Sequence, residues 1–197
     1  MIKEPDNLGK IFDKHIEYEF DKEDVEAAMT TMTDEPYVHH VPTLTGGFGY
    51  NEVYGFYKNR FVGKMPKDIK IKPISRTVGK DQVVDEIVIS FTHDREIEYM
   101  LPWLEPTGRY VEIPHLVIMK LDGLNIAHEH IYWDQASVLV QIGLIEEKIY
   151  LLREFSKQDE YSSCPTISFF IVHNFVSYYW KLWHYIDGDF DLQLSNN

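Results

Sequence analysis

The sequence predicts an α+β fold in which helices come first and a strongly bent β-sheet follows. Three observations support this fold class. Apolar residues recur at helical spacing over the first part of the chain, the centre is rich in Ile, Val and aromatic residues, and only short connections separate the central segments. A length of 197 residues suits one domain, or one domain with an appendage.

The N-terminal part, residues 8–33, reads as helical because Ile11, Phe12, His15 and Ile16 begin a three-to-four residue repeat that continues along the segment. We expect two helices with a break near residues 20–23. Asp21 or Asp24 is suited to cap the second helix, because a short carboxylate accepts a hydrogen bond from a free helical N–H group.

A transition from helix to sheet is predicted over the next thirty or so residues. Residues 37–41 form a short strand-like piece that ends at Pro42, and residues 45–49 form a glycine-rich turn. Asn51 can then cap a helix that continues to about Val62.

The centre of the chain contains five segments with strand composition, separated by Gly-, Pro- and Asp-containing turns. Their connections are too short for crossover helices, so we expect an antiparallel meander. Residues 135–144 return to helix or coil. The predicted strands cover residues 69–78, 82–92, 96–101, 110–121 and 126–134.

The C-terminal part, residues 146–197, differs in composition from the rest. Residues 146–158 are compatible with a helix, but the aromatic-rich residues 164–186 follow neither a strand nor a helix period. We therefore divide the chain into a domain over residues 1–145 and an unassigned extension over 146–197. The extension is either a genuine aromatic or membrane-associated tail or the product of an incorrect gene model.

The charge distribution excludes some classes of partner. The net charge is −13, with 32 acidic and 19 basic residues. Residues 1–46 carry 11 acids and 4 bases, whereas residues 47–145 are nearly neutral with 13 acids and 11 bases. This balance disfavours unspecific binding to nucleic acid or to anionic membranes.

Cysteine usage and hydropathy indicate a cytoplasmic protein. The single cysteine, Cys164, has no internal partner for a disulfide and cannot supply a cysteine-rich zinc site. The first 25 residues are charged throughout, unlike a signal peptide, and the uncharged residues 161–180 are too polar for a membrane span. We also find no glycine-rich nucleotide-binding motif, so no cofactor is expected.

The densest group of chemically active residues lies in the last predicted strand. Alternation places His128, His130, Tyr132 and Asp134 on one face and Glu129, Ile131 and Trp133 on the other, as residues on a strand point to opposite faces in turn. The polar row either lines a pocket or forms a satisfied structural network. His-x-His spacing also occurs in metal sites, but with one cysteine and no fixed third ligand we expect no functional metal.

Other candidate residues lie elsewhere in the predicted domain. Asp85 and Glu86 are adjacent within an apolar strand, so one of them must face inward unless the strand bulges or both lie at a solvated edge. His40 lies between the helices and the sheet, and His93 follows a strand. His115 shares its face with apolar residues, which is more typical of a hydrogen-bonded core histidine than of a catalyst.

The order of several motifs resembles the SnoaL-like polyketide-cyclase family of the nuclear transport factor 2-like (NTF2-like) superfamily. The resemblance covers roughly residues 8–145. The matching motifs are Val41-Pro42-Thr43, the glycine turn, Phe91-Thr92-His93-Asp94, Met100-Leu101-Pro102, Pro106-Thr107-Gly108-Arg109, Asp122-Gly123, and His128 through Gln141-Ile142-Gly143.

The resemblance implies a cone in which a curved sheet wraps around helices and encloses a pocket. Relatives include cyclases, isomerases, epoxide hydrolases, dehydratases and non-catalytic modules. In the cyclases an aspartate at the end of the last strand is the acid/base, and Asp134 matches that position. His40 is nearest to another pocket position, whereas His115 is out of register with the cyclase histidine.

These observations predict a small-molecule pocket protein that performs metal-free acid/base chemistry on a carbonyl-containing metabolite. The reaction would be isomerisation, cyclisation, dehydration or lactone hydrolysis, with Asp134 as acid/base and with His128 and His130 assisting. Tyr132, His40, His93, Asp85 and Glu86 are the expected substrate-binding residues. The alternative function is that of a non-catalytic binding or dimerisation module. The alternative role for Asp134 is that of a helix cap. We also expect a homodimer that forms through the exposed face of the sheet.

Overall fold

The computed structural model describes residues 5–146, and the side chains from residue 8 onward. The predictions for residues 147–197 lie outside this part of the chain, so the division of the chain at residue 145 stays a prediction. The described part contains four α-helices, two π-helical turns and six strands. Among its helices none has the length and apolar character needed to cross a bilayer.

The N-terminal helical segment is interrupted as predicted. Helix α1 (Pro5–Ile16) continues into a π-helical turn, η1 (Glu17–Asp21), and α2 (Val25–Met29) follows after a short break. Asp24 caps α2 by accepting a hydrogen bond from the Ala27 N–H group at 2.9 Å. Helix α3 (Gly49–Phe56) similarly ends in a π-helical turn, η2 (Tyr57–Phe61).

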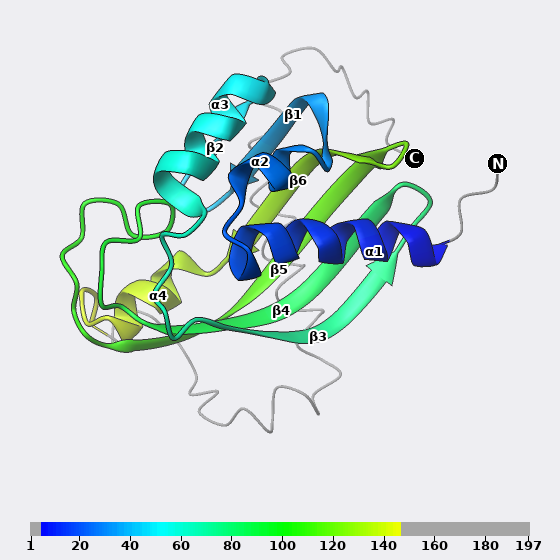
Figure 1. Cartoon of the computed structure of the whole chain (residues 1–197). Coiled ribbons are helices and arrows are strands. Elements are labelled where there is room, and N and C mark those ends of the chain that lie inside the picture. Colours follow the sequence, from blue (N-terminus) through cyan, green and yellow to red (C-terminus); the bar gives the residue numbers. More distant parts are fainter. Residues whose placement is uncertain (1–4, 147–197) are drawn as a thin grey trace, which may run out of the picture. The chain divides into compact units, whose positions relative to one another are not determined.

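A single curved sheet of six strands, in the order β2-β1-β6-β5-β4-β3, forms the other layer (Figure 1). The predicted antiparallel meander is confirmed for four strands, β3 (Lys70–Val78), β4 (Gln82–Thr92), β5 (Tyr110–Asp122) and β6 (Asn125–Trp133). The sheet is nevertheless mixed, because β1 (Met32–His40) runs parallel to β6.

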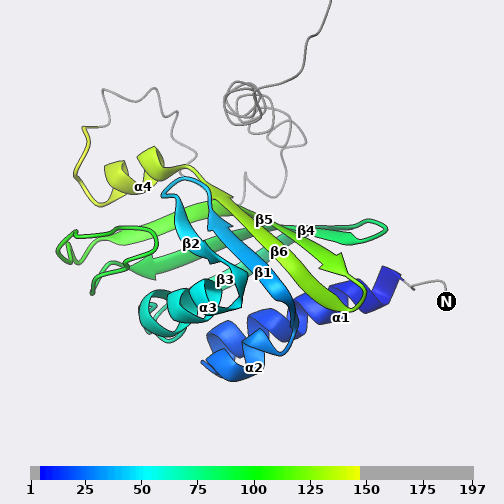
Figure 2. The ribbon, with the colours of Figure 1, turned by 90° about the horizontal axis from the view of Figure 1, so that it is seen from above.

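Helices α1, α2 and α3 gather on one face of the sheet, as Figure 2 shows. The hydrophobic core fills the space between them and the sheet. In β5, buried and partly exposed residues alternate along the strand, which matches the period of two expected for a sheet with one covered face. Helix α4 (Gln135–Gln141) lies apart from the other helices, at the end of β6.

Three local predictions are wrong. Asn51 does not cap a helix, because α3 begins at Gly49 and Phe48 occupies the N-cap position.

Residues 96–101 form turns with an isolated bridge between Ile97 and Leu101 rather than a strand. Several consecutive residues there are buried, so their apolar run imitates a strand, and the following Pro102 has no N–H group for a ladder.

The predicted glycine turn is instead strand β2 (Thr45–Phe48), paired with β1. The two glycines allow this close approach. A Cβ atom on Gly46 would lie 1.9 Å from the Val38 carbonyl oxygen, and one on Gly47 would lie 2.6 Å from the Glu52 backbone. The turn signal was therefore a sign of close backbone contact.

Candidate functional site

A cavity of about 240 Å³ lies between the helices and the inner face of the sheet. Most of its wall is apolar, with side chains from α1, η2 and the central strands. Polar side chains interrupt this apolar wall, a combination typical of small-molecule sites. The buried ones among them are Glu19, His40, Tyr57, Asp85, Tyr99, His115 and Glu129.

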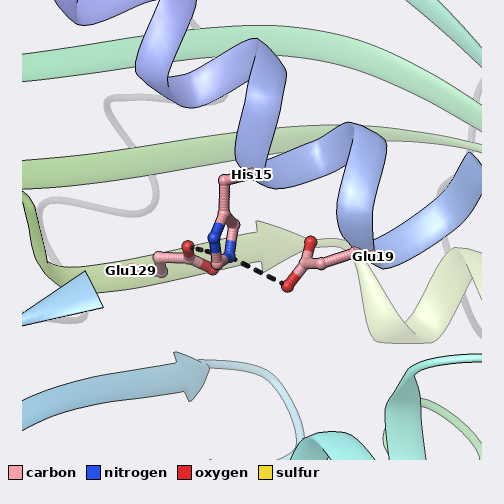
Figure 3. Close-up of side chains that lie close together, drawn as sticks. All are labelled: His15, Glu19 and Glu129. Atoms are coloured by element: carbon pink, nitrogen blue, oxygen red, sulfur yellow. Dashed lines mark hydrogen bonds and ion pairs between the residues drawn. The ribbon is translucent and has the colours of Figure 1, made fainter. Parts of the chain in front are cut away.

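One buried polar cluster combines three segments that are distant in sequence (Figure 3). The Nε2 atom of His15, at the end of α1, lies 3.1 Å from Glu19 Oε1 and 2.9 Å from Glu129 Oε1 of β6. The hydroxyl of Tyr57 lies 3.1 Å from the same Nε2 atom and 3.5 Å from Glu129 Oε2. His15, Glu19, Tyr57 and Glu129 are all buried, so the cluster belongs to the interior.

The His15 ring is oriented by Thr31. Thr31 Oγ1 donates to the Ala28 carbonyl oxygen at 2.6 Å, so the His15 Nδ1–H group is the donor in its 2.5 Å contact with Oγ1. Burial lowers the pKa of His15, but the carboxylates of Glu129 and Glu19 outweigh burial and raise it to about 10. Burial raises the pKa of Glu19.

His40 and His115 line the cavity, and both imidazoles are neutral. Burial lowers the pKa of His115 to about 4, and burial together with the nearby His115 lowers the pKa of His40 to about 3. The His115 Nδ1–H group donates to the Ile113 carbonyl oxygen at 3.1 Å. Because a neutral imidazole carries one N–H group, Nε2 of His115 presents a lone pair.

His115 Nε2 and His40 Nδ1 have no hydrogen-bond partner among the described residues, although both atoms are buried. The rings are held by aromatic contacts: His115 stacks on Trp133 at 5.3 Å, and His40 lies 4.8 Å from the Tyr99 ring and 5.8 Å from Trp133. Unpartnered buried nitrogens are costly unless a bound molecule satisfies them. The two imidazoles are therefore strong candidates for ligand contact.

Of the alternatives for the adjacent carboxylates of β4, the structure shows the one in which one of the pair faces inward. Asp85 is buried, lines the cavity and forms an ion pair with Arg76, whose Nε lies 2.6 Å from Oδ1. Arg76 also binds Asp13 at 2.7 Å, and hydrogen bonds to Asp85 and Asp13 raise its pKa. Glu86 instead accepts a hydrogen bond from Ser75 Oγ at 2.9 Å.

The predicted row of His128, His130 and Tyr132 does share one face, but it is the face opposite the cavity. His128 and His130 are half-buried against Tyr37 of β1, with ring centroids 4.6 and 5.3 Å from the Tyr37 ring. Our expectation that this row lines the pocket is wrong. Strand parity groups residues correctly but does not indicate which group faces the helices, and here Glu129, Ile131 and Trp133 do.

Asp134 does not lie in the cavity either. It caps α4, accepting hydrogen bonds from the Ala136 N–H group at 3.0 Å and from Ser137 Oγ at 2.6 Å, and its side chain is exposed. The alternative role as a helix cap is therefore the one that the structure shows. His93 is buried beside Thr107, 3.2 Å from its hydroxyl, and does not line the cavity.

His15, Glu19, Tyr57 and Glu129 were not predicted as site residues. Two sequence signals were present. Glu129 shares strand parity with the apolar residues Ile131 and Trp133, and His15 and Glu19 are four residues apart on a helix. Their meeting depends on packing α1 against β6, which no local pattern specifies. In the described part of the chain, His15, Glu19 and Glu129 are also the group of side chains suited to metal ligation, with ligand atoms within 4.8 Å of one another.

Comparisons with known proteins identify the fold. No family model matches the sequence, and no curated protein matches it. Among solved structures, a protein described as a SnoaL-like polyketide cyclase from Jannaschia sp. CCS1 aligns over 68% of this chain and 92% of its own, with 16% identity and a TM-score of 0.53.

Two other solved structures have the same fold. TsrD from Streptomyces laurentii aligns over 73% of this chain and 99% of its own, with 13% identity and a TM-score of 0.58. The epoxide hydrolase/cyclase-like enzyme SalBIII is associated with pyran ring formation in the polyether salinomycin. It aligns over 66% of this chain and 92% of its own, with 16% identity and a TM-score of 0.50. The described domain thus shares its α+β fold with these three structures. It shares it also with an NTF2-like protein from Burkholderia pseudomallei, which aligns over 70% of this chain and 98% of its own, with 12% identity and a TM-score of 0.54.

Proposed function

We propose that this protein binds an uncharged, carbonyl-containing small molecule in the cavity and moves a proton on it. His115 is the proposed acid/base residue, in place of Asp134, and His40 is a second polar contact. The reaction class is isomerisation, cyclisation, dehydration or lactone hydrolysis. The relatives described as cyclase and epoxide hydrolase/cyclase-like support this class by analogy of fold.

The observation that carries the proposal is the state of His115. Its Nδ1–H group is bound to the Ile113 carbonyl, so the free atom is an unpartnered Nε2 lone pair in a cavity-lining residue. Such a nitrogen can accept a proton from a carbon next to a carbonyl group or from a hydroxyl group. The hydrogen bond at Nδ1 fixes the tautomer and the ring orientation throughout.

The charges around the cavity favour an uncharged ligand. The lining includes six carboxyl groups, and its guanidinium group, Arg76, is already bound to Asp85 and Asp13. The carboxyl groups are those of Asp13, Glu17, Glu19, Asp21, Asp85 and Glu129. An anionic ligand would meet this negative potential without a free cation to compensate it. The apolar walls, in contrast, suit the ring system of a cyclic ketone, a lactone or a polyketide.

In the proposed reaction, His115 Nε2 takes the proton and becomes an imidazolium while the substrate becomes an enolate. The imidazolium then returns the proton to a different carbon or to a leaving oxygen. The developing oxyanion raises the pKa of the adjacent imidazole, because opposite charges stabilise each other in a dry site. The pKa of His115 is low in the free protein, but it rises as the transition state forms, so the imidazole can then hold the proton.

A ligand-binding screen tests the proposal. A panel of dienelactones, polyketides and cyclic ketones is assayed by thermal shift, since a molecule that binds the native state raises the melting temperature. We expect His115→Gln to abolish the shift and any turnover of the best ligand. His93→Gln is a matched control, because His93 is also buried with an unpartnered Nε2 but does not line the cavity. Ligand binding lost in both variants or in neither would contradict the proposal.

A non-catalytic binding or dimerisation module is the second candidate, because the outer sheet face carries an aromatic patch. Tyr37 stacks on His128 and on Phe48, and Phe48 is 67% exposed. We propose a homodimer through this face, and light scattering tests it. Ligand binding without turnover, together with a dimer that Phe48→Ser disrupts, would favour the module over the enzyme.

A further inference from the structure

We propose that His15, Glu19 and Glu129 form a binding site for one divalent transition-metal cation in the wall of the cavity. This inference goes beyond the proposed function, which transfers protons through side chains and uses none of these three residues as a base. It also revises the sequence-based expectation of no functional metal.

Metal-ligating side chains from three elements converge at this point of the fold. Three groups that are common metal ligands come from α1, η1 and β6, and their ligand atoms lie within 4.8 Å of one another. A tetrahedral zinc ion with ligands at about 2.0–2.1 Å needs ligand atoms about 3.3 Å apart. The two measured separations from His15 Nε2, 2.9 and 3.1 Å, reach this value with shifts of a few tenths of an ångström, on the order of ordinary side-chain adjustment.

The hydrogen bonds of His15 direct its Nε2 atom into the cluster. Thr31 holds the Nδ1–H group, so Nε2 points toward two carboxylates. In the metal-free protein Nε2 carries a proton, because the carboxylates stabilise the imidazolium, and a metal ion would replace that proton. Metal-ligating histidines are oriented in this way, with the second ring N–H bound to a fixed acceptor. Because a lone pair and two carboxylates only accept hydrogen bonds, the space between them requires either a proton or a cation.

The cluster also carries uncompensated charge. In the described residues, the ion pairs of Glu19 and Glu129 are both with His15, so two buried carboxylates share one imidazole. The buried Glu129 Oε1 atom has this 2.9 Å ion pair but no further hydrogen bond there. Buried negative charge without full compensation is costly, and a divalent cation with a neutral imidazole would balance two carboxylates.

The cluster is also reachable. Glu19, Glu129 and Tyr57 line the cavity, so a cation can enter from that side, and the Tyr57 hydroxyl is close enough to contribute a further oxygen. One nitrogen and two carboxylate oxygens favour zinc, iron(II), cobalt(II) or manganese(II) over the soft copper(I) ion, which prefers sulfur. Zinc and cobalt(II) are therefore suitable probes.

The test uses the full chain, treated with a chelator and then titrated with Zn²⁺ in a calorimeter. We expect one Zn²⁺ per chain. Glu129→Gln and Glu19→Gln should each weaken binding at least about tenfold, because an amide supplies a weaker ligand than a carboxylate. Glu112→Gln is the matched control, since Glu112 is a half-buried carboxylate on the neighbouring strand β5, and it should bind Zn²⁺ like the unmodified protein.

Cobalt(II) provides a second readout that does not depend on activity. Its visible absorption should be saturated by one equivalent and should be lost in both Gln variants. If Glu129→Gln does not fold, as judged by circular dichroism, Glu19→Gln decides the question. Absence of stoichiometric binding would overturn the proposal, because the cluster would then hold only a proton. Binding that survives both Gln variants but is lost in His130→Gln would also overturn it, because the metal would then lie on the outer face of β6.

Discussion

The two faces of strand β6 carry similar chemical groups in different surroundings. The outer face has His128, His130 and Tyr132, half-buried against one another and against Tyr37. The inner face has Glu129, Ile131 and Trp133, all buried between the sheet and the helices. The outer row has the higher density of catalytic residue types, but the inner row borders the cavity, so burial and enclosure are better indicators of a site than composition.

The largest expected difference between the faces concerns stability. Trp133→Ala should lower the free energy of unfolding by about 3–5 kcal/mol, because it leaves a large cavity beside His40, Tyr99 and His115. Tyr132→Ala on the outer face should lower the free energy of unfolding by about 1 kcal/mol, because that ring is only half-buried. Chemical denaturation of both variants measures the contrast, and equal losses would break the comparison.

A smaller difference concerns pH. His115 and His40 are neutral in the folded protein, with pKa values below that of an unfolded histidine. The unfolded chain therefore binds more protons below about pH 6.5, so stability should fall as the pH decreases from 6.5 to 4. His115→Gln should make the free energy of unfolding depend less steeply on pH over this range.

The outer-face variant His130→Gln is the control for the pH experiment. Burial and the neighbouring His128 also lower the pKa of His130 to about 4, but that ring is half-exposed and can move toward solvent when it becomes charged. We therefore expect His130→Gln to flatten the slope less than His115→Gln. The opposite order in urea titrations at several pH values would show that the outer face is the more constrained one.

The smallest expected effect is that of Asp134. Asp134→Ala should cost about 1 kcal/mol of stability, since the cap of α4 is lost, and should leave ligand binding in the cavity unchanged. Asp134→Asn should cost less, because an amide oxygen can still accept the Ala136 N–H group. Melting temperature and ligand affinity measured on the same variant distinguish a helix cap from a ligand-binding residue. A loss of affinity would show that Asp134 takes part in ligand binding.

The sequence was most informative where one local rule decides the structure. Periodicity, capping and strand parity predicted the break after α1, a cap at Asp21 or Asp24 and the meander from β3 to β6. Parity also predicted that one of Asp85 and Glu86 faces inward, but not which one. The SnoaL-like resemblance supplied the NTF2-like fold, which the solved structures confirm.

The site was less predictable because it depends on contacts between distant segments. His15 and Glu129 meet only when α1 packs across β6, and the parallel pairing of β1 with β6 brings His40 beside Trp133. Parity placed His128 and Glu129 on opposite faces but could not tell which face the helices cover. The large apolar residues Ile131 and Trp133 on the Glu129 face were the signal that could have decided it.

The most direct test of the account follows the histidine ring nitrogens by long-range ¹H–¹⁵N NMR while the best ligand of the screen is added. We predict that the ring signals of His115 and His40 shift in a saturable way, with His115 Nε2 unprotonated in the free protein at pH 7. The ring signals of His128 and His130 should stay unchanged, because these residues lie on the other face of the sheet. Saturable shifts at His128 and His130 with none at His115 and His40 would contradict the central claim that the cavity on the inner face of β6 is the functional site.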